Sequence, residues 1–448
     1  MRVLIIETSA LGDRSYVVID SGVAVVIDPQ RDIDRVLDVV GDARITHVLE
    51  THVHNDYVTG GLELSRAVGA EYVVPDGETL GYPARRVRDG DVVDADGFSL
   101  TVIHTPGHTD HHVAYELRDD AGTTAGVFTG GSLLFGSTGR TDLVDDDQTE
   151  SLARAQYRSV RRLADSLPSD AEVYPTHGFG SFCSASPVND DSSTIGRQRQ
   201  ANPALTRSEQ EFVDELLSAL SDYPTYYAHM GVINTEGPQP LDLSNPKPVD
   251  AGELRHRLEA GEWVVDLRQR VAFAAGHLAG SLGFELSGSF VTYLGWLHPW
   301  GTPLTLIAEN EEQIAEARRE LARIGVDDIA GAADLGTADN AGGTRSYRVA
   351  DFAALADVIG DGTVTVLDVR QVDDFADSHV TGALNIPLHE LIDRIDELPR
   401  NQAWVHCASG YRASIAASIL DSRSRDVVLI DDDFDEAEAQ GIVESSHA

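Results

Sequence analysis

Thr51-His52-Val53-His54-Asn55-Asp56-Tyr57 directly follows an apolar run that ends at Leu49. Two histidines two positions apart at the end of a strand direct both rings toward one pocket once the chain bends into a loop. Neutral imidazole is the commonest metal-binding side chain in proteins. This stretch therefore predicts a metal pocket at a strand end, with His52, His54 and Asp56 as candidate ligands.

Two more histidines follow strand-like runs further along the chain. His108 lies in His104-Thr105-Pro106-Gly107-His108-Thr109, and His177 lies in Tyr174-Pro175-Thr176-His177-Gly178. One histidine alone is more often structural, but several at strand ends point to a shared site. We therefore add His108 and His177 to the candidate ligands.

The chain around these histidines mixes short β-type runs with helical patterns. The β-type runs cover residues 16–19, 23–28, 47–51 and 100–104, and the helical patterns cover residues 33–40, 151–167 and 208–220. Turn residues bound most of the β-type runs, and this mixture predicts a layered α/β domain over residues 1–236.

A linker and a sequence repeat follow this domain. Residues 237–248 contain four prolines, which forbid a continuing helix. Beyond the linker, Asp266-Leu267-Arg268 is matched by Asp368-Val369-Arg370, and Gly276-His277-Leu278-Ala279-Gly280-Ser281 by Ser378-His379-Val380-Thr381-Gly382-Ala383, at an offset of 102 residues. The repeat predicts two copies of one α/β domain, residues 249–340 and 346–446.

Only the second copy contains a cysteine, Cys407, which sits between a β run and an alanine-rich helical pattern. In such a loop, backbone N–H groups and the helix N-terminus stabilise a thiolate or an anion, and Arg412 adds a fixed positive charge. We expect Cys407 and Arg412 to be catalytic. The loop residues between them are the candidate substrate-binding groups: Ala408, Ser409, Gly410 and Tyr411. The first copy has Glu309, Glu311 and Glu312 at the corresponding place, so we expect it to have a structural or interfacial role.

These motifs resemble known families. His52-x-His54-x-Asp56, His108, Phe128-Thr129-Gly130-Gly131 and His177 resemble the metallo-β-lactamase fold, near glyoxalase II and the persulfide dioxygenases. Gly139-Arg140-Thr141-Asp142 resembles the persulfide dioxygenase branch, which implies a substrate-binding role for Arg140.

The repeat resembles rhodanese domains, which carry sulfur as a cysteine persulfide. Its active loop has the four residues between cysteine and arginine that suit sulfur transfer better than phosphatase chemistry. The pattern weakens at Asp431-Asp432-Asp433-Phe434, where the family has a glycine-rich motif. The resemblances together imply an α/β protein: an αββα sandwich followed by two rhodanese-like α/β domains.

Two departures from the family pattern affect the metal site. Tyr57 stands where the family has a further histidine, and Gly131 stands where persulfide dioxygenases have the aspartate of a two-histidine, one-carboxylate iron triad. We therefore expect one metal ion per chain, held chiefly by His52, His54 and His108. Iron is favoured over zinc by a small margin.

The favoured function is persulfide or thiosulfate metabolism, with sulfur transfer at Cys407 and oxidation or cleavage of a low-molecular-weight persulfide at the metal. Two alternatives stay open: a glyoxalase II-like thioester hydrolase with accessory rhodanese domains, and a sulfur-carrier protein whose metal site is inactive. Cys183 lies close to His177 in sequence and is either a second sulfur relay or a packed cysteine. The oligomeric state, including a homo-oligomer, is left open.

The composition indicates where the protein works. Acidic residues number 74 against 34 basic ones, a net charge of −40, and Lys247 is the single lysine. A dispersed anionic surface of this kind is typical of a halophilic cytoplasm, and it disfavours nucleic acid and anionic membranes as partners. Two cysteines, no apolar run long enough to span a membrane and no signal peptide also predict a cytoplasmic protein.

Overall fold

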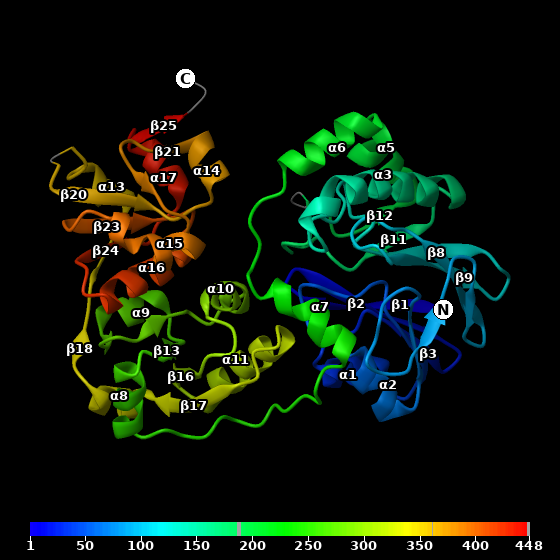
Figure 1. The fold of residues 1–448 in the computed structure, drawn as a ribbon, viewed down its shortest axis with the longest axis horizontal. Coiled ribbons are helices and arrows are strands. Elements are labelled where there is room, and N and C mark those ends of the chain that lie inside the picture. The colour runs from blue at the N-terminus through cyan, green and yellow to red at the C-terminus, as the bar shows by residue number, and fades with distance from the viewer. Residues whose placement is uncertain (186–189, 361, 446–448) are drawn as a thin grey trace. The chain divides into compact units, whose positions relative to one another are not determined.

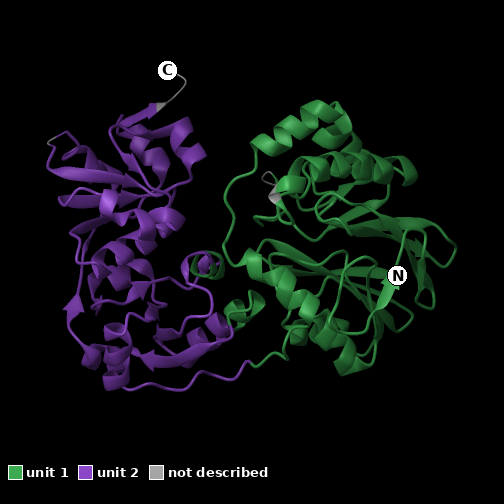
Figure 2. Cartoon of the chain, in the orientation of Figure 1, with its two compact units in different colours: residues 1–242, 291–295, 319–326 green, residues 243–290, 296–318, 327–448 purple. Residues whose placement is uncertain are grey.

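The computed structural model describes residues 1–185, 190–360 and 362–445. The chain divides into two compact units (Figure 2). Unit 1 comprises residues 1–242, 291–295 and 319–326, and unit 2 comprises residues 243–290, 296–318 and the described part of 327–448. Among the described residues, no helix has both the length and the apolar character needed to cross a membrane.

Unit 1 contains two six-stranded sheets. The first has the order β1-β2-β3-β4-β5-β6, antiparallel through β3 and parallel from β3 to β6. Its strands are β1 (Arg2–Thr8), β2 (Asp13–Asp20), β3 (Val23–Ile27), β4 (Arg44–Leu49), β5 (Glu71–Pro75) and β6 (Arg85–Val87).

The second sheet has the order β12-β11-β10-β9-β8-β7, antiparallel except for the parallel pair of β10 and β11. Its strands are β7 (Val92–Asp94), β8 (Phe98–His104), β9 (Val113–Asp119), β10 (Thr124–Gly130), β11 (Glu172–Pro175) and β12 (Ser193–Thr194).

The two sheets pack face to face, and helices cover their outer faces (Figure 1). Alternation along β2 shows the layering: Tyr16 and Val18 join the core between the sheets, whereas Val17 and Ile19 join the cluster under α1 and α2. The helices of this unit are α1 (Ile33–Val40), α2 (Gly61–Val68), α3 (Thr149–Ser166), α4 (Ile195–Ala201), α5 (Pro203–Thr206), α6 (Glu209–Ser218) and α7 (Tyr227–Glu236). The result is an αββα sandwich, so the predicted fold class is confirmed.

Local sequence accounts for several helix limits in unit 1. The predicted helix at residues 33–40 is α1, and the helix predicted at 151–167 begins two residues earlier as α3. At the start of α6, the Ser208 hydroxyl accepts from the Glu211 amide while the Glu211 carboxylate accepts from the Ser208 amide. This reciprocal pair satisfies two backbone donors that a helix start otherwise leaves unpaired.

Unit 2 contains two parallel sheets, β15-β13-β16-β17 and β19-β24-β23-β20-β22. Two small antiparallel pairs, β14-β18 and β21-β25, accompany them. The strands are β13 (Trp263–Asp266), β14 (His277–Leu278), β15 (Leu282–Gly283), β16 (Leu304–Ala308), β17 (Ile329–Asp334), β18 (Thr344–Arg345), β19 (Arg348–Ala350), β20 (Val364–Asp368), β21 (Ser378–Val380), β22 (Leu384–Asn385), β23 (Gln402–His406), β24 (Val427–Ile430) and β25 (Val443–Ser445).

Helices flank both sheets of unit 2. They are α8 (Ala251–Glu259), α9 (Arg270–Ala275), α10 (Phe290–Leu297), α11 (Glu311–Arg323), α12 (Leu335–Ala341), α13 (Phe352–Ala356), α14 (Val372–Asp377), α15 (Leu391–Arg394), α16 (Tyr411–Ser422) and α17 (Phe434–Ala439), with parts of α10 and α11 belonging to unit 1. The two copies share one topology, because β13 lies between β15 and β16 just as β20 lies between β22 and β23. This shared topology supports the predicted repeat.

Candidate functional site

The predicted metal ligands lie in loops that follow strands of both sheets of unit 1. His52, His54 and Asp56 follow β4, His108 lies between β8 and β9, and His177 follows β11. All five side chains are buried. The topology therefore brings together residues that are as much as 125 positions apart in sequence.

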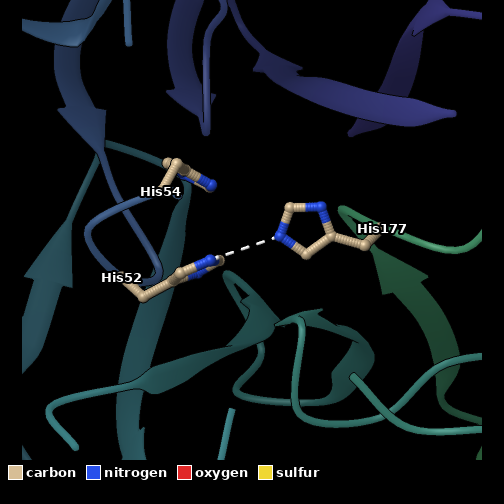
Figure 3. Close-up of side chains that lie close together, drawn as sticks. All are labelled: His52, His54 and His177. Atoms are coloured by element: carbon tan, nitrogen blue, oxygen red, sulfur yellow. Dashed lines mark hydrogen bonds between the residues drawn. The ribbon is translucent and has the colours of Figure 1, made fainter. Parts of the chain in front are cut away.

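His52 and His177 face each other through their Nε2 atoms, which are 3.2 Å apart (Figure 3). Two nitrogens bound to one tetrahedral metal at roughly 2.0–2.1 Å lie about 3.3 Å from each other. His108 completes a triangle of rings, with centroids 4.9 Å from His52 and 5.3 Å from His177, while His52 and His177 are 5.2 Å apart. Three imidazoles thus surround one point.

Each of these three rings has a partner at its other nitrogen. The Nδ1 atom of His108 lies 2.7 Å from the carbonyl oxygen of Arg140, that of His177 lies 2.9 Å from the Asp13 carboxylate, and that of His52 lies 2.9 Å from the Thr51 hydroxyl. Metal-binding histidines usually have such partners, which fix the tautomer and direct Nε2 to the metal. The donor set therefore fits a metal ion.

His54 is oriented differently. Its Nε2 lies 3.2 Å from Glu50, 3.3 Å from Asp28 and 3.0 Å from the Tyr57 hydroxyl, while its buried Nδ1 has no hydrogen-bond partner in the described part of the chain. The ligand atoms of His52, His54 and His177 lie within 4.8 Å of one another. The Nδ1 atom of His54 is thus available to a metal. Tyr57, which stands where the resemblance implies a histidine, contacts the other ring nitrogen, Nε2.

His108 is held between two glycines. A Cβ atom on Gly131 would lie 2.6 Å from Cγ of His108, and a Cβ on Gly139 would lie 2.6 Å from its Nδ1. The neighbouring His112 accepts from the Gly131 amide at Nε2 and contacts the Thr105 hydroxyl at Nδ1, so both its nitrogens are occupied. The imidazole of His108 therefore fills the space that a side chain at position 131 would need.

Asp56 and Cys183 lie next to this histidine cluster. The ligand atoms of His108, His177 and Cys183 lie within 4.8 Å of one another, as do those of Asp13, Asp56 and His177. Asp56 Oδ2 is 3.0 Å from His177 Nδ1, yet neither carboxylate oxygen accepts a hydrogen bond of regular geometry from the described residues. Sequence spacing gives no sign that Asp13 orients His177, because the two are 164 positions apart.

Burial and neighbouring carboxylates set the charge states in this pocket. Burial lowers the pKa of His108 to about 3 and that of His52 well below its ordinary value. Burial also lowers the pKa of His177, but Asp56 and Asp13 outweigh it and raise the value to about 10. Burial and the charge of Asp56 raise the pKa of the Cys183 thiol. Burial also lowers the pKa of His54, but Asp28 and Glu50 outweigh it and raise the value to about 9. Without a cation, this cluster therefore combines neutral imidazoles at His52 and His108, imidazoliums at His54 and His177, and a neutral thiol.

Arg140, the predicted substrate-binding residue, is buried. Its guanidinium donates to Asp142 at 2.7 Å and to the carbonyl oxygens of Phe182 and Ser221, while its own carbonyl holds His108. These contacts give Arg140 a part in positioning His108. Its predicted role with the substrate stays a prediction.

The second candidate site surrounds Cys407 in unit 2. Cys407 follows β23, is 2% exposed, and its Sγ accepts from the Ala413 amide at 3.4 Å in the first turn of α16. Gly410 adopts a left-handed conformation with φ of 87°, which bends the loop into the helix. Arg412 Nη1 lies 3.6 Å from Asp374. Cys407 therefore lies at the start of a helix, and the roles of Arg412 and the loop residues stay predictions.

Residues of the first copy reach this loop, as the expected interfacial role requires. Arg270 pairs with Asp431 at 2.6 Å and with Glu285 at 2.8 Å, and the Tyr411 hydroxyl donates to the Glu285 carbonyl oxygen at 3.0 Å. Asp431 packs against Gly410 within the loop. Asp431 belongs to the segment where the sequence departs from the family pattern, and only the structure shows its partner in the other copy.

Comparisons with known proteins match both parts of the chain in which the candidate sites lie. A metallo-beta-lactamase superfamily model matches residues 5–177, and a rhodanese-like domain model matches residues 351–440. The mitochondrial persulfide dioxygenase ETHE1 of Homo sapiens is 31% identical over 252 residues, covering 55% of this chain and 84% of that protein. A hydroxyacylglutathione hydrolase of Pseudomonas paraeruginosa is 34% identical over 158 residues, covering 34% of this chain and 56% of that protein.

Among solved structures, a metallo-beta-lactamase from Staphylococcus aureus subsp. aureus COL matches with a TM-score of 0.67 and 28% identity, covering 74% of this chain and 98% of that chain. Homology to a persulfide dioxygenase in one part of the chain and a rhodanese-like domain in another support a role as an enzyme of sulfur metabolism. The chain belongs to the persulfide dioxygenase family of the metallo-β-lactamase superfamily and carries a rhodanese-like domain at residues 351–440.

Proposed function

We propose that this protein processes sulfane sulfur, with a sulfurtransferase reaction at Cys407 and a metal-dependent reaction on a low-molecular-weight persulfide in unit 1. The hydrogen bond from the Ala413 amide to Cys407 Sγ at the start of α16 is the main support for the proposed sulfurtransferase reaction. A helix N-terminus stabilises a thiolate and a bound anion, which is what thiosulfate chemistry needs.

In the first step, the Cys407 thiolate attacks the outer sulfur of thiosulfate. A new S–S bond forms at Cys407, the S–S bond of thiosulfate breaks, and sulfite leaves with the bonding electron pair. A thiolate acceptor then attacks the outer sulfur of the Cys407 persulfide, and Cys407 leaves as a thiolate. We expect the backbone amides of Ala408 to Tyr411 and the Arg412 guanidinium to bind the anionic sulfur donor.

In unit 1 the proposed cofactor is one metal ion per chain, with iron preferred to zinc, and the proposed chief ligands are His52, His54 and His108. His177, whose Nε2 lies 3.2 Å from that of His52, and Asp56 are further candidate ligands. A bound ion supplies a Lewis-acidic position at which sulfur or oxygen is activated. Asp13, Thr51 and the Arg140 carbonyl hold the imidazoles in position. A pocket that includes Tyr72, Val74, Leu80 and Tyr82 adjoins His52 and His54, and its apolar walls suit the organic part of a thiol.

For persulfide oxidation, the persulfide, dioxygen and one water give the thiol, sulfite and two protons. The family relationship to a persulfide dioxygenase favours this reaction. The second candidate is hydrolysis of a thioester. It is favoured by the similarity to a hydroxyacylglutathione hydrolase over residues of the same domain.

Thiosulfate-dependent sulfur transfer to a thiol acceptor tests the assignment of Cys407. Cys407→Ser should abolish the transfer, because the variant has no sulfur nucleophile in the loop. Cys183→Ser, the matched control, should leave it largely intact. Full activity of Cys407→Ser would show that the sulfurtransferase assignment is wrong.

A further inference from the structure

Gly131 has no side chain to offer the proposed metal site. Persulfide dioxygenases have a carboxylate at this position, and a glycine offers only its backbone. The structure also shows that the missing side chain could not simply be added, because the His108 ring lies against Gly131.

Cys183 is the buried group that lies beside the histidines at this point. It is 0% exposed, and its sulfur lies within 4.8 Å of the ligand atoms of both His108 and His177. Thiolate sulfur is a strong ligand for zinc and iron, and it is an anion once bound. Cys183 can therefore supply an anionic ligand atom, which the glycine at position 131 cannot.

Asp56 gives a second sign that a metal ion belongs here, in addition to its ion pair with His177, whose Nδ1 lies 3.0 Å from Asp56 Oδ2. Its side chain is 1% exposed, and neither of its carboxylate oxygens accepts a hydrogen bond of regular geometry among the described residues. Buried carboxylates without hydrogen bonds are rare unless an ion completes their surroundings. The two groups of candidate ligand atoms, one of His108, His177 and Cys183 and one of Asp13, Asp56 and His177, share His177.

The backbone fixes Cys183 in this position. Its carbonyl oxygen accepts from the Arg140 amide at 2.9 Å, and its amide donates to the Ser181 hydroxyl at 3.2 Å. Arg140 also holds His108 through its carbonyl oxygen. The same short segment of chain therefore positions the thiol and the neighbouring imidazole together.

We propose that Cys183 is a ligand of the metal ion in unit 1 and replaces the carboxylate that the family has at position 131. On binding, the S–H bond breaks, the sulfur lone pair forms the metal–sulfur bond, and the proton leaves to solvent. The cation is a divalent ion that accepts imidazole and thiolate together, which is the preference of zinc and ferrous iron. The inference rests on the proposal that unit 1 binds a metal.

Cobalt substitution tests this ligand directly, because a thiolate bound to Co²⁺ gives an intense charge-transfer band in the near ultraviolet. The full-length protein is stripped with a chelator, loaded anaerobically with Co²⁺, and its spectrum recorded. The band should appear in the unchanged protein and in Cys407→Ser, the matched control that removes the other cysteine. It should be absent in Cys183→Ser, whose Co²⁺ affinity should fall at least about tenfold.

X-ray absorption at the metal edge keeps the inference testable if Cys183→Ser fails to fold. The unchanged protein loaded with zinc should show one sulfur scatterer at about 2.3 Å. One bound metal with only nitrogen and oxygen neighbours would overturn the assignment of Cys183 and leave the proposed metal site standing. No bound metal in any variant would overturn both.

Discussion

Replacing Gly131 with alanine should destabilise unit 1 and weaken its metal site, because the new methyl group collides with a proposed ligand. The Cβ atom would lie 2.6 Å from Cγ and 2.7 Å from Nε2 of His108. The ring has little freedom to retreat. Its Nδ1 is bonded to the Arg140 carbonyl at 2.7 Å, and Gly139 packs closely against its other side.

The magnitude follows from two opposing effects. Overpacking a buried site costs about 1–3 kcal/mol. Exchanging glycine for alanine gains about 0.4–1 kcal/mol by restricting the unfolded chain, provided that the backbone angles suit alanine. The net loss should be roughly 1–2 kcal/mol. For a unit of this size, that loss lowers the melting temperature by about 2–8 °C.

Calorimetry of the metal-free protein measures the stability change, and titration with Zn²⁺ measures the affinity. The matched control is Gly288→Ala, since a Cβ at Gly288 meets nothing within 4 Å. We expect Gly131→Ala to lower both the melting temperature and the Zn²⁺ affinity, and Gly288→Ala to lower neither. A Gly131→Ala protein with unchanged stability and unchanged affinity would refute the packing of His108 against position 131.

Three other predictions concern unit 2, the ion pairs of unit 1 and salt. Arg270→Met should raise the KM for thiosulfate, because Asp431 and Glu285 then lose their counter-charge beside the Cys407 loop. The control is Arg255→Met, which loses contacts to carbonyl oxygens of α12. Equal KM values in the two variants would contradict the role of Arg270. Arg323→Leu should cost about 1–3 kcal/mol in urea unfolding, because buried Asp32 loses its contact at 2.6 Å and keeps Arg35 and Arg319 at 3.4 Å. Arg158→Leu, at an exposed pair with Glu209, is the control, and a similar small loss in both variants would count against the buried pair. The net charge of −40 should make stability and activity rise from dilute buffer to molar KCl, because salt screens the repulsion between carboxylates. The Debye length falls from about 10 Å at 0.1 M to about 3 Å at 1 M salt. A melting temperature that stays flat or falls as KCl rises would contradict the halophile interpretation.

Much of the fold could be predicted from local sequence. The helix of residues 33–40 and the strands around residues 16–19 and 100–104 carry clear periodicity, and the structure has an element at each. The repeat at an offset of 102 residues predicts two related domains from sequence alone. The place of the last turn of α11 could not be predicted from sequence. Its residues 319–323 belong to unit 1, where Arg319 and Arg323 pair with Asp34 and Asp32. Contacts between charges nearly 300 positions apart leave no local pattern.

The candidate sites could be predicted only in part. The ligand atoms of His52, His54 and His177 lie within 4.8 Å of one another, as do those of His108, His177 and Cys183, and Cys407 lies at the start of a helix. Glu50, Asp28 and Tyr57 contact Nε2 of His54 and so leave Nδ1 available to a metal. The spacing of these residues in the sequence does not predict this geometry. The proximity of Cys183 to His108 and the contact of Arg270 with Asp431 arise from tertiary packing, so only the structure shows them.

The central claim is that the metal-loaded chain consumes persulfide sulfur. The most direct measurement follows a low-molecular-weight thiol persulfide and dissolved oxygen together, with protein loaded with iron and with the same protein after metal removal. The account predicts loss of persulfide with oxygen uptake in the iron-loaded protein and neither change in the stripped protein. Persulfide left intact by the iron-loaded protein, together with rapid hydrolysis of a glutathione thioester, would contradict it.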